Sequence, residues 1–294
     1  MSEIVPISAE LIASLCPVRD DKGHKGTFGT ALICAGSEDM TGAQMLATES
    51  ALRSGVGMVR VFAERGSMYA TRVNCPCAMY SSYEVSIEDT VKKAAGLLER
   101  AGCVLIGPGL DPDDKRNAAL LILFIKRAKH LVIDASALNI LAREQADTLP
   151  LLEERQGQGL APAILTPHVG EFKRLAGETG EEQCVSFASK YNCILILKDH
   201  NTFISCSGGR SFRLEGNNSG MSKGGSGDVL AGLITGLTAQ GMKEEDAAIS
   251  AVYIHSAAGR AAAADLGKRS MLPCDIPAYF TDAFEEVMWE AKGE

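Results

Sequence analysis

The chain alternates between short apolar runs and longer segments in which apolar residues recur with a helical period. Each short run is closed by glycine or polar residues, and such runs are typical of strands that are buried on both faces of a sheet. The predicted strands span residues 30–36, 56–63, 103–106, 131–134, 163–166 and 194–198.

Segments of helical character lie between these strands and on either side of them. The predicted helices span residues 7–12, 41–52, 67–72, 87–100, 117–128, 137–141, 229–237, 244–265 and 275–291. Strands alternate with helices from residue 30 to about residue 200, which is the pattern of a parallel sheet with helices on both faces. We therefore expect a three-layer α/β fold with a mostly parallel central sheet.

The alternation of predicted strands and helices ends after Lys198. Residues 202–205 and 210–214 flank a short glycine-containing turn and are predicted to form a hairpin. The sequence shows no proline- or serine-rich linker and no internal repeat, and residues 150–162 have the composition of a surface loop. A single domain spanning residues 1–294 is the expected organisation.

A glycine-rich stretch, residues 216–228, follows the hairpin and leads directly into the predicted helix at residues 229–237. Glycines allow several backbone N–H groups to turn toward one point, and the dipole of the following helix adds partial positive charge there. The stretch is therefore predicted to bind an anion, most simply a phosphate group.

Asp228 ends this stretch, where its carboxylate would repel a bound phosphate. One interpretation is that Asp228 takes a proton from a hydroxyl group that attacks the phosphate. The other is that Asp228 caps the N-terminus of the helix, because aspartate is among the favoured N-cap residues. The residues alone leave both interpretations open.

Five further segments of small and polar residues follow predicted strands directly: residues 36–43, 107–109, 134–136, 167–171 and 198–202. Ligands of doubly wound sheets bind beyond the carboxyl ends of the strands, so parallel strands would bring all five segments to one edge. Neither standard nucleotide-binding pattern is present. The chain has no Gly-x-x-x-x-Gly-Lys-Ser/Thr, and Leu230 stands where a third glycine would complete Gly225-x-Gly227.

Four titratable residues each have a functional and a structural interpretation. His168 follows a predicted strand and is either a turn residue or a ligand contact. Glu171 could orient magnesium-bound water or simply begin a helix. Lys198 could bind phosphate as a point charge or lie solvated at a strand end. His255 lies inside an alanine-rich helix, where a packing role is the simpler interpretation.

Composition narrows the classes of partner. The 294 residues are 46% hydrophobic and 22% charged, and the net charge of −8 disfavours nucleic acid and anionic membranes. No apolar run approaches the roughly 20 residues that span a bilayer, and no leader segment is visible. The nine cysteines are scattered and odd in number, which indicates free thiols in the cytoplasm, and Cys75-Pro76-Cys77 is interpreted as structural.

Five motifs together resemble a known family. They are Lys25-Gly26-Thr27-Phe28-Gly29, Met40-Thr41-Gly42-Ala43, Gly107-Pro108-Gly109, Pro167-His168-Val169-Gly170-Glu171 and Gly225-Ser226-Gly227-Asp228. In this order they are similar to the ADP-dependent NAD(P)H-hydrate dehydratases of the ribokinase-like superfamily, which repair hydrated nicotinamide cofactors. Gly-Ser-Gly-Asp alone indicates only the superfamily. The epimerase domain that precedes the dehydratase in some members is not expected in this chain.

The resemblance implies a ribokinase-like fold and two parts of one cleft. It implies that Ala43, Gly109, His168 and Asp228 line the site for hydrated NADH or NADPH, with Asp228 as general base. It implies that ADP or ATP, with Mg²⁺, is held by Lys198, Asp199, His200, Asn201, Thr202, Asn217, Ser219, Gly220, Met221, Gly225, Ser226 and Gly227. His168-x-x-Glu171 resembles the Asn-x-x-Glu that lies near magnesium in the superfamily kinases.

Three positions depart from the family's usual pattern. Ser136 replaces an aspartate, Asp199 replaces a glycine and Val169 replaces a proline. Ser136 weakens any role for that position, and Asp199 adds negative charge near the expected phosphate. Family members often form tetramers, so we expect a homo-oligomer. The alanine-rich segments 43–52 and 247–264 could pack between subunits or equally well inside one.

Two other functions are weighed against the dehydratase. A ribokinase-like kinase of a small alcohol would use the same Asp228 but stop at the phosphorylated product, and the Pro-His-x-Gly-Glu motif argues against it. A regulatory protein that binds nucleotide without turnover has no use for an acid that faces phosphate, so Asp228 argues against this class.

Overall fold

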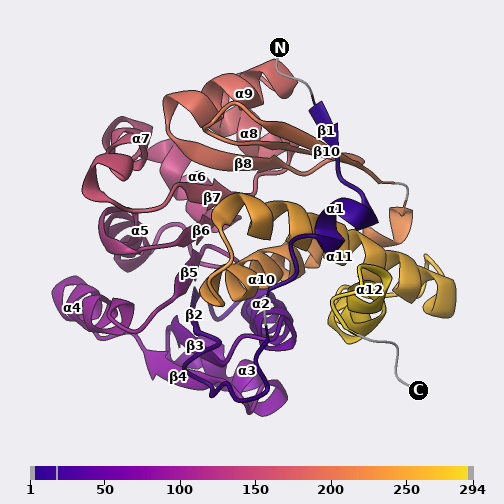
Figure 1. Cartoon of the computed structure of the whole chain (residues 1–294). Helices are drawn as coiled ribbons and strands as arrows, with labels where there is room; N and C mark the ends of the chain where they lie inside the picture. Colours follow the sequence, from indigo (N-terminus) through magenta and orange to yellow (C-terminus); the bar gives the residue numbers. More distant parts are fainter. Residues whose placement is uncertain (1–3, 18, 217, 291–294) are drawn as a thin grey trace.

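A ten-stranded sheet runs through the computed structural model, which describes residues 4–17, 19–216 and 218–290 (Figure 1). The strand order within these residues is β1-β10-β9-β8-β7-β6-β5-β2-β3-β4. The strands are β1 (Ile4–Pro6), β2 (Thr30–Cys34), β3 (Met58–Ala63), β4 (Met79–Ser82), β5 (Cys103–Ile106), β6 (Leu131–Ile133), β7 (Ala163–Leu165), β8 (Cys193–Leu197), β9 (Asn201–Ser205) and β10 (Ser211–Glu215).

The central strands are parallel, as predicted. Every pairing from β4 through β3, β2, β5, β6 and β7 to β8 is parallel. The predicted hairpin is also confirmed, because β9 pairs antiparallel with β10 and, on its other side, with β8. Six strands therefore end at the same edge of the sheet as β8, and the loops that follow them gather there.

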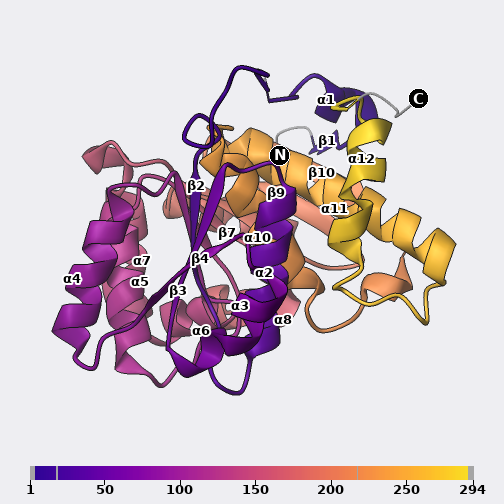
Figure 2. The same ribbon diagram turned by 90° about the horizontal axis from the view of Figure 1, so that it is seen from below.

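Helices cover both faces of the sheet, which confirms the three layers (Figures 1 and 2). One layer holds α1 (Ala9–Ala13), α2 (Thr41–Arg53), α3 (Tyr69–Asn74), α10 (Ser226–Ala239), α11 (Glu244–Leu266) and α12 (Phe280–Glu286). The other holds α4 (Ile87–Leu98), α5 (Lys115–Arg127), α6 (Ser136–Arg143), α7 (Gln145–Glu154), α8 (Val169–Ala176) and α9 (Glu181–Lys190). Short 3₁₀ helices are η1 (Gly66–Met68), η2 (Gln156–Gln158), η3 (Ser219–Met221) and η4 (Ile276–Tyr279).

The apolar runs of the sequence are explained by this double covering. In β2, Ala31 and Ile33 belong to the core under α2, α10 and α11, whereas Leu32 and Cys34 belong to the core on the other face. Successive side chains of a strand point to opposite faces, so a strand covered on both sides must be apolar at every position.

α2 and α10 pack closely because small residues line their contact. A Cβ atom on Gly232 would lie 2.3 Å from the carbonyl oxygen of Ala47, and one on Gly236 would lie 2.0 Å from Ser54 Oγ. The Ser50 hydroxyl donates to the carbonyl of Val229 at 2.6 Å. Most alanines of both predicted segments serve packing inside the chain: Ala47, Ala51, Ala247, Ala248, Ala251, Ala258 and Ala262 are fully buried. The predicted tetramer thus loses the support of exposed alanine surfaces.

The interpretation of residues 150–162 as a surface loop is wrong. α7 continues to Glu154 and η2 follows it, and the side chain of Arg155 between them is fully buried. The predicted C-terminal helix is broken into η4 and α12, with Pro277 near the start of η4, and its last residue, 291, lies outside the described residues. β1 and β4 were not predicted: β1 has only three residues, and β4 is half polar.

Candidate active site

Parallel pairing brings the predicted segments together at the carboxyl edge of the sheet. His168, just beyond β7, forms a parallel bridge with Lys198, just beyond β8. The amide of Gly36, beyond β2, donates to the carbonyl of Pro108, beyond β5, at 2.7 Å. Asp134 follows β6 between these two pairs. The five segments named from the sequence therefore do share one edge.

The glycine-rich stretch is folded back on itself in front of α10. The side chain of Asn218 accepts from the amide of Gly220 at 3.0 Å, at the start of η3. The Ser226 hydroxyl donates to the carbonyl of Met221 at 2.7 Å, which ties the end of this stretch to its middle. Asn217 lies outside the described residues. Gly225, with φ of 107°, is the N-cap of α10, and its left-handed backbone turns the chain into the helix.

Asp228 is the third residue of α10 and does not cap it. No side chain caps this helix, and among the described residues none donates a hydrogen bond to the Asp228 carboxylate. The N-cap interpretation is therefore wrong. Burial raises the pKa of this carboxyl to about 7, helped by the charges of Asp134 and Glu171 and opposed by Lys198. An acid with a pKa near neutrality can exchange a proton with a substrate hydroxyl.

Lys198 is not a solvated strand end. Its ammonium nitrogen lies 2.9 Å from Oδ1 of Asp134, and its side chain is only 22% exposed. Asp134 is buried and also accepts a hydrogen bond from the Thr166 hydroxyl at 2.6 Å. The nearby carboxylates raise the pKa of Lys198 although burial acts to lower it, so the lysine is held as a cation.

His168 and Glu171 form a capping box at the start of α8. Nδ1 of His168 accepts from the amides of Gly170 and Glu171 at 3.0 and 3.3 Å, and Oε2 of Glu171 accepts from the amide of His168 at 2.9 Å. The turn and helix-start interpretations are thus confirmed. Because Nδ1 accepts, the neutral ring carries its proton on Nε2, which lies 3.5 Å from Oε1 of Glu171, and the side chain is 55% exposed. A ligand contact through Nε2 stays a prediction.

Ala43 and Gly109 meet across the two loops that follow β2 and β5. A Cβ atom on Gly109 would lie 2.8 Å from Cβ of Ala43 and 2.7 Å from the carbonyl oxygen of Met40. Gly109 has φ of 63°, a conformation that L-residues with side chains rarely adopt. These two residues can therefore shape a ligand surface only through their backbone and a methyl group.

The predicted nucleotide loop after β8 is shorter than expected. Asn201 and Thr202 lie in β9, so only Asp199 and His200 follow Lys198 in the turn. Both are exposed, and Oδ1 of Asp199 accepts from the amide of His200 at 2.7 Å. The side chain of Asn201 accepts from the amide of Gly216 at 3.2 Å, which joins this turn to the start of the glycine-rich stretch. The two nucleotide segments thus adjoin.

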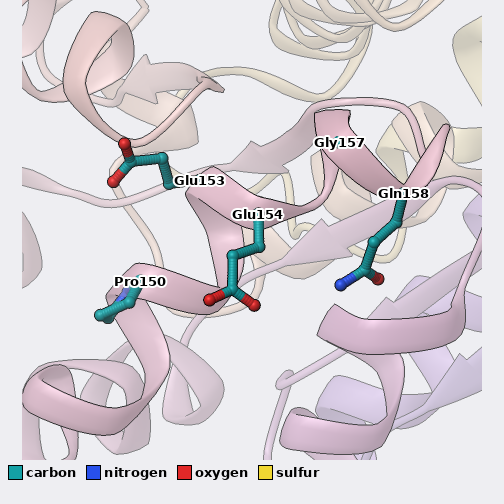
Figure 3. Close-up of a pocket in the computed structure, with 5 residues that line it drawn as sticks. All are labelled: Pro150, Glu153, Glu154, Gly157 and Gln158. Carbon is teal, nitrogen blue, oxygen red and sulfur yellow. The ribbon is translucent and has the colours of Figure 1, made fainter.

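Asp134 and Thr166 were not singled out as individual site residues. The available signal was the position of Asp134 directly after an apolar strand, but its partner Lys198 is 64 residues away. A surface hollow of about 650 Å³ lined by Pro150, Glu153, Glu154, Gly157 and Gln158 is a different feature (Figure 3). It lies just before β7 in the chain, toward the opposite edge of the sheet.

Magnesium was expected near Glu171. Among the described residues there is no group of three His, Cys, Asp or Glu side chains that could hold a metal ion. Mg²⁺ in nucleotide enzymes is usually bound by phosphate oxygens and water with one or two carboxylates. Glu171 and Asp228 are close enough for the charge of Glu171 to raise the pKa of Asp228. All nine cysteines are free, as predicted.

Residues 31–281 match the family model described as NAD(P)H-hydrate dehydratase. The chain is 33% identical to the ADP-dependent (S)-NAD(P)H-hydrate dehydratase of Staphylococcus aureus over 267 residues, covering 88% of this chain and 91% of the relative. It is 34% identical to the bifunctional NAD(P)H-hydrate repair enzyme of Moorella thermoacetica over 282 residues, covering 92% of this chain and 52% of the relative. The chain thus spans about half the length of such bifunctional relatives.

Solved structures agree on the fold. The ADP/ATP-dependent NAD(P)H-hydrate dehydratase of Bacillus subtilis, co-crystallised with ATP and Mg²⁺, superimposes with a TM-score of 0.83 and 27% identity, covering 99% of this chain and 100% of that chain. A hydroxyethylthiazole kinase from Pyrococcus horikoshii has a TM-score of 0.56 and 15% identity, covering 94% and 91%, and shares the fold alone.

Proposed function

The chain belongs to the NAD(P)H-hydrate dehydratase family, and we propose that it restores NADH and NADPH from the S forms of their hydrates, with ADP or ATP as co-substrate. The observation that carries the proposal is the Asp228 carboxylate: it lies in the first turn of α10, receives no hydrogen bond from the residues that the structure describes, and has its pKa raised to about 7. A phosphate site without chemistry has no use for such an acid.

The chemistry follows from the hydrate itself. Hydroxide is a poor leaving group, and a phosphoryl group transferred onto the ring hydroxyl makes phosphate the leaving group instead. Asp228 accepts the hydroxyl proton as the oxygen attacks the terminal phosphate of the nucleotide. The ring nitrogen's lone pair then expels phosphate to give an iminium ion, and loss of a proton from the adjacent ring carbon restores the dihydropyridine. With ADP the products are AMP and phosphate.

The glycine-rich stretch supplies the phosphate end of this reaction. Backbone N–H groups at the N-terminus of α10 and the ammonium of Lys198 provide positive charge that needs no rearrangement during transfer. Ser219, Gly220 and Met221 in η3, with Gly225, Ser226 and Gly227, are the proposed phosphate-side residues, and Asp199 to Thr202 hold the rest of the nucleotide.

Glu171 is the proposed carboxylate for magnesium. The ion would neutralise charge on the nucleotide oxygens, and Glu171 would order its bound water through its carboxylate, whose Oε2 accepts from the amide of His168 and whose Oε1 lies 3.5 Å from Nε2 of His168. Ala43, Gly109 and the Nε2 proton of His168 are proposed to face the hydrate.

Purified protein mixed with hydrated NADH, ADP and Mg²⁺ tests the function. Recovery of the reduced-nicotinamide absorbance with release of phosphate supports it, and no recovery with either ADP or ATP contradicts it. A stable phosphorylated alcohol without dehydration would instead assign the chain to the kinases that share its fold.

We expect the rate to depend on pH through Asp228. Its carboxyl must be ionised to accept a proton, so kcat/KM should fall about tenfold per pH unit below the pKa near 7. A profile between about pH 5.5 and 8.5 measures this limb. The same profile for His168→Asn identifies the group, because a limb due to the imidazole would vanish there. A limb near pH 4, where ordinary carboxyls titrate, contradicts the prediction.

His168→Ala should weaken affinity for hydrated NADH about tenfold and leave ADP affinity within a few-fold, because one Nε2 hydrogen bond is lost. Calorimetric titration of both ligands measures the two affinities. His168→Asn is the matched control, since asparagine can still cap α8 but has no group at the position of Nε2. Both variants should lose hydrate affinity, and only the alanine variant should lose about 1 kcal/mol of stability. If the variants lose ADP binding and retain hydrate binding, His168 belongs to the nucleotide-binding part of the site instead.

We also propose that the chain forms a single domain and that the protein is a homo-oligomer, most simply a tetramer. Light scattering measures the number of subunits. None of the helices in the described ranges is both long and apolar enough to cross a bilayer. We place the enzyme in the cytoplasm, where its nine free thiols stay reduced.

A further inference from the structure

We propose that Asp134 is a positioning residue that holds the ammonium of Lys198 against the first turn of α10, where the ammonium binds the nucleotide's phosphates. The inference rests on the proposed function and adds a residue that the motifs did not point to. Asp134 itself touches neither substrate. It acts through Lys198.

Asp134 is held through both its carboxylate and its backbone. Its side chain is 1% exposed, and its Oδ1 accepts from both the Thr166 hydroxyl and Lys198 Nζ. Its amide donates to the carbonyl of Ile106 at 3.1 Å. A Cβ atom on Gly107 would lie 1.7 Å from the carbonyl oxygen of Asp134, so the neighbouring loop packs directly on this backbone. A carboxylate held this firmly dictates where its cation sits.

The cation sits beneath Gly227. A Cβ atom on Gly227 would lie 3.0 Å from Lys198 Nζ, tighter than nine in ten real contacts, so a side chain at this position would push the ammonium away from the helix start. An ammonium has three donors, and among the described residues its one hydrogen-bond acceptor is Asp134. Since the side chain is 22% exposed, donors remain for phosphate oxygens at the N-terminus of α10.

Asp134 also acts on Asp228 at a distance. The charged groups that face Asp228 are Asp134 beyond β6, Glu171 on α8 and Lys198 beyond β8. The two carboxylates raise the pKa of Asp228 and the lysine lowers it. His255 on α11 also lies near Lys198, but burial and that lysine lower its pKa to about 4, so it is neutral and adds no charge. Removing the charge of Asp134 should therefore lower the pKa of Asp228.

The test is Asp134→Asn in the full chain, with a thermal melt first to establish folding. We expect ADP affinity, measured by calorimetric titration, to fall about tenfold, because the ammonium is no longer held at the helix start. We expect the acid limb of kcat/KM to move to lower pH by roughly one unit. A residue that only supports the fold would not move this limb. Unchanged ADP affinity with an unmoved limb overturns the proposal.

Two further variants sharpen the test. Lys198→Met should weaken ADP binding too but move the limb the opposite way, to higher pH, because the charge that lowers the pKa of Asp228 is gone. This variant decides the matter if Asp134→Asn does not fold. Glu84→Gln is the matched control: it removes one negative charge and a lysine ion pair of 2.6 Å beyond the edge strand β4. Glu84→Gln should change neither the ADP affinity nor the position of the acid limb. Changes as large as those in Asp134→Asn would overturn the proposal.

The outcome separates this inference from the proposed function. If wild-type protein does not dehydrate the hydrate, the proposed function fails, but ADP titration of Asp134→Asn and Lys198→Met still tests positioning. If wild-type protein is active and Asp134→Asn behaves like Glu84→Gln, the function stands and the positioning role is wrong.

Discussion

Asp228→Asn should lower kcat about 10²–10⁴-fold, because asparagine cannot accept the proton of the attacking hydroxyl. Nucleotide binding should stay largely intact, since the proposed phosphate site consists of backbone N–H groups and Lys198. Steady-state assays that follow the reduced-nicotinamide absorbance with hydrated NADH as substrate measure kcat, and calorimetric titration measures ADP binding. Turnover near that of the wild type would show that Asp228 is not the base.

The same substitution should make the folded protein more stable above neutral pH. The pKa of Asp228 is about 7 in the fold against 3.8 for an ordinary aspartate, so the fold favours the protonated form. The unfolded chain releases this proton first as pH rises, and stability is lost progressively from about pH 4 to pH 7. Asparagine removes that cost, which we place at about 1–3 kcal/mol at pH 8.

Denaturant unfolding at about pH 8 and pH 4 measures this difference, which should vanish at the lower pH. Asp21→Asn, at an exposed position, is the control and should have little effect at either pH. A stability gain in Asp228→Asn together with lost turnover is the signature of a carboxylate kept for chemistry. A loss of stability would mean that the carboxylate makes a contact that supports the fold.

The local sequence pattern is sufficient to predict the strands of this fold that are buried on both faces. β5 was predicted with the bounds it has, because Cys103–Ile106 is an uninterrupted apolar run between two glycines. β4 escaped prediction because Met79–Ser82 is half polar and only partly buried, at the edge of the sheet. β1 has three residues, and its parallel partner β10 is far away in the chain. Such pairings depend on contacts that no local pattern records.

The site divides in the same way. The glycine-rich stretch and Asp228 are adjacent in the chain, so their joint chemistry was predicted. The ion pair between Asp134 and Lys198 depends on the order of β6, β7 and β8 in the sheet, and it was missed. The N-cap interpretation of Asp228 failed because the helix begins at Ser226 and its N-cap is Gly225, three residues before Asp228. A difference of a few residues in where the helix starts therefore decides whether a carboxylate caps the helix or remains available for proton transfer.

Arg155 is the largest departure from expectation, and its burial has a physical reason. Its guanidinium donates to carbonyl oxygens at the C-terminus of α5 and beyond, among them Ile125 at 2.6 Å and Ala128 at 3.0 Å, while Nε donates to Ala161 at 3.0 Å. The last carbonyls of a helix lack partners within it, and they carry partial negative charge. Burial lowers the pKa of Arg155 to about 10, so it is still charged at neutral pH.

Arg155→Met should therefore cost about 3–5 kcal/mol of unfolding free energy, since several buried carbonyls lose their donor at once. Denaturant unfolding measures the cost. Arg143→Met is the control: that side chain is 48% exposed beside Asp113, and its loss should change stability by no more than about 1 kcal/mol. Arg155→Lys should fall between, because an ammonium keeps the charge but cannot reach all the carbonyls. If Arg155→Met is as stable as Arg143→Met, apolar packing replaces the buried guanidinium. The carbonyl groups at the C-terminus of α5 then do not need the hydrogen bonds of Arg155.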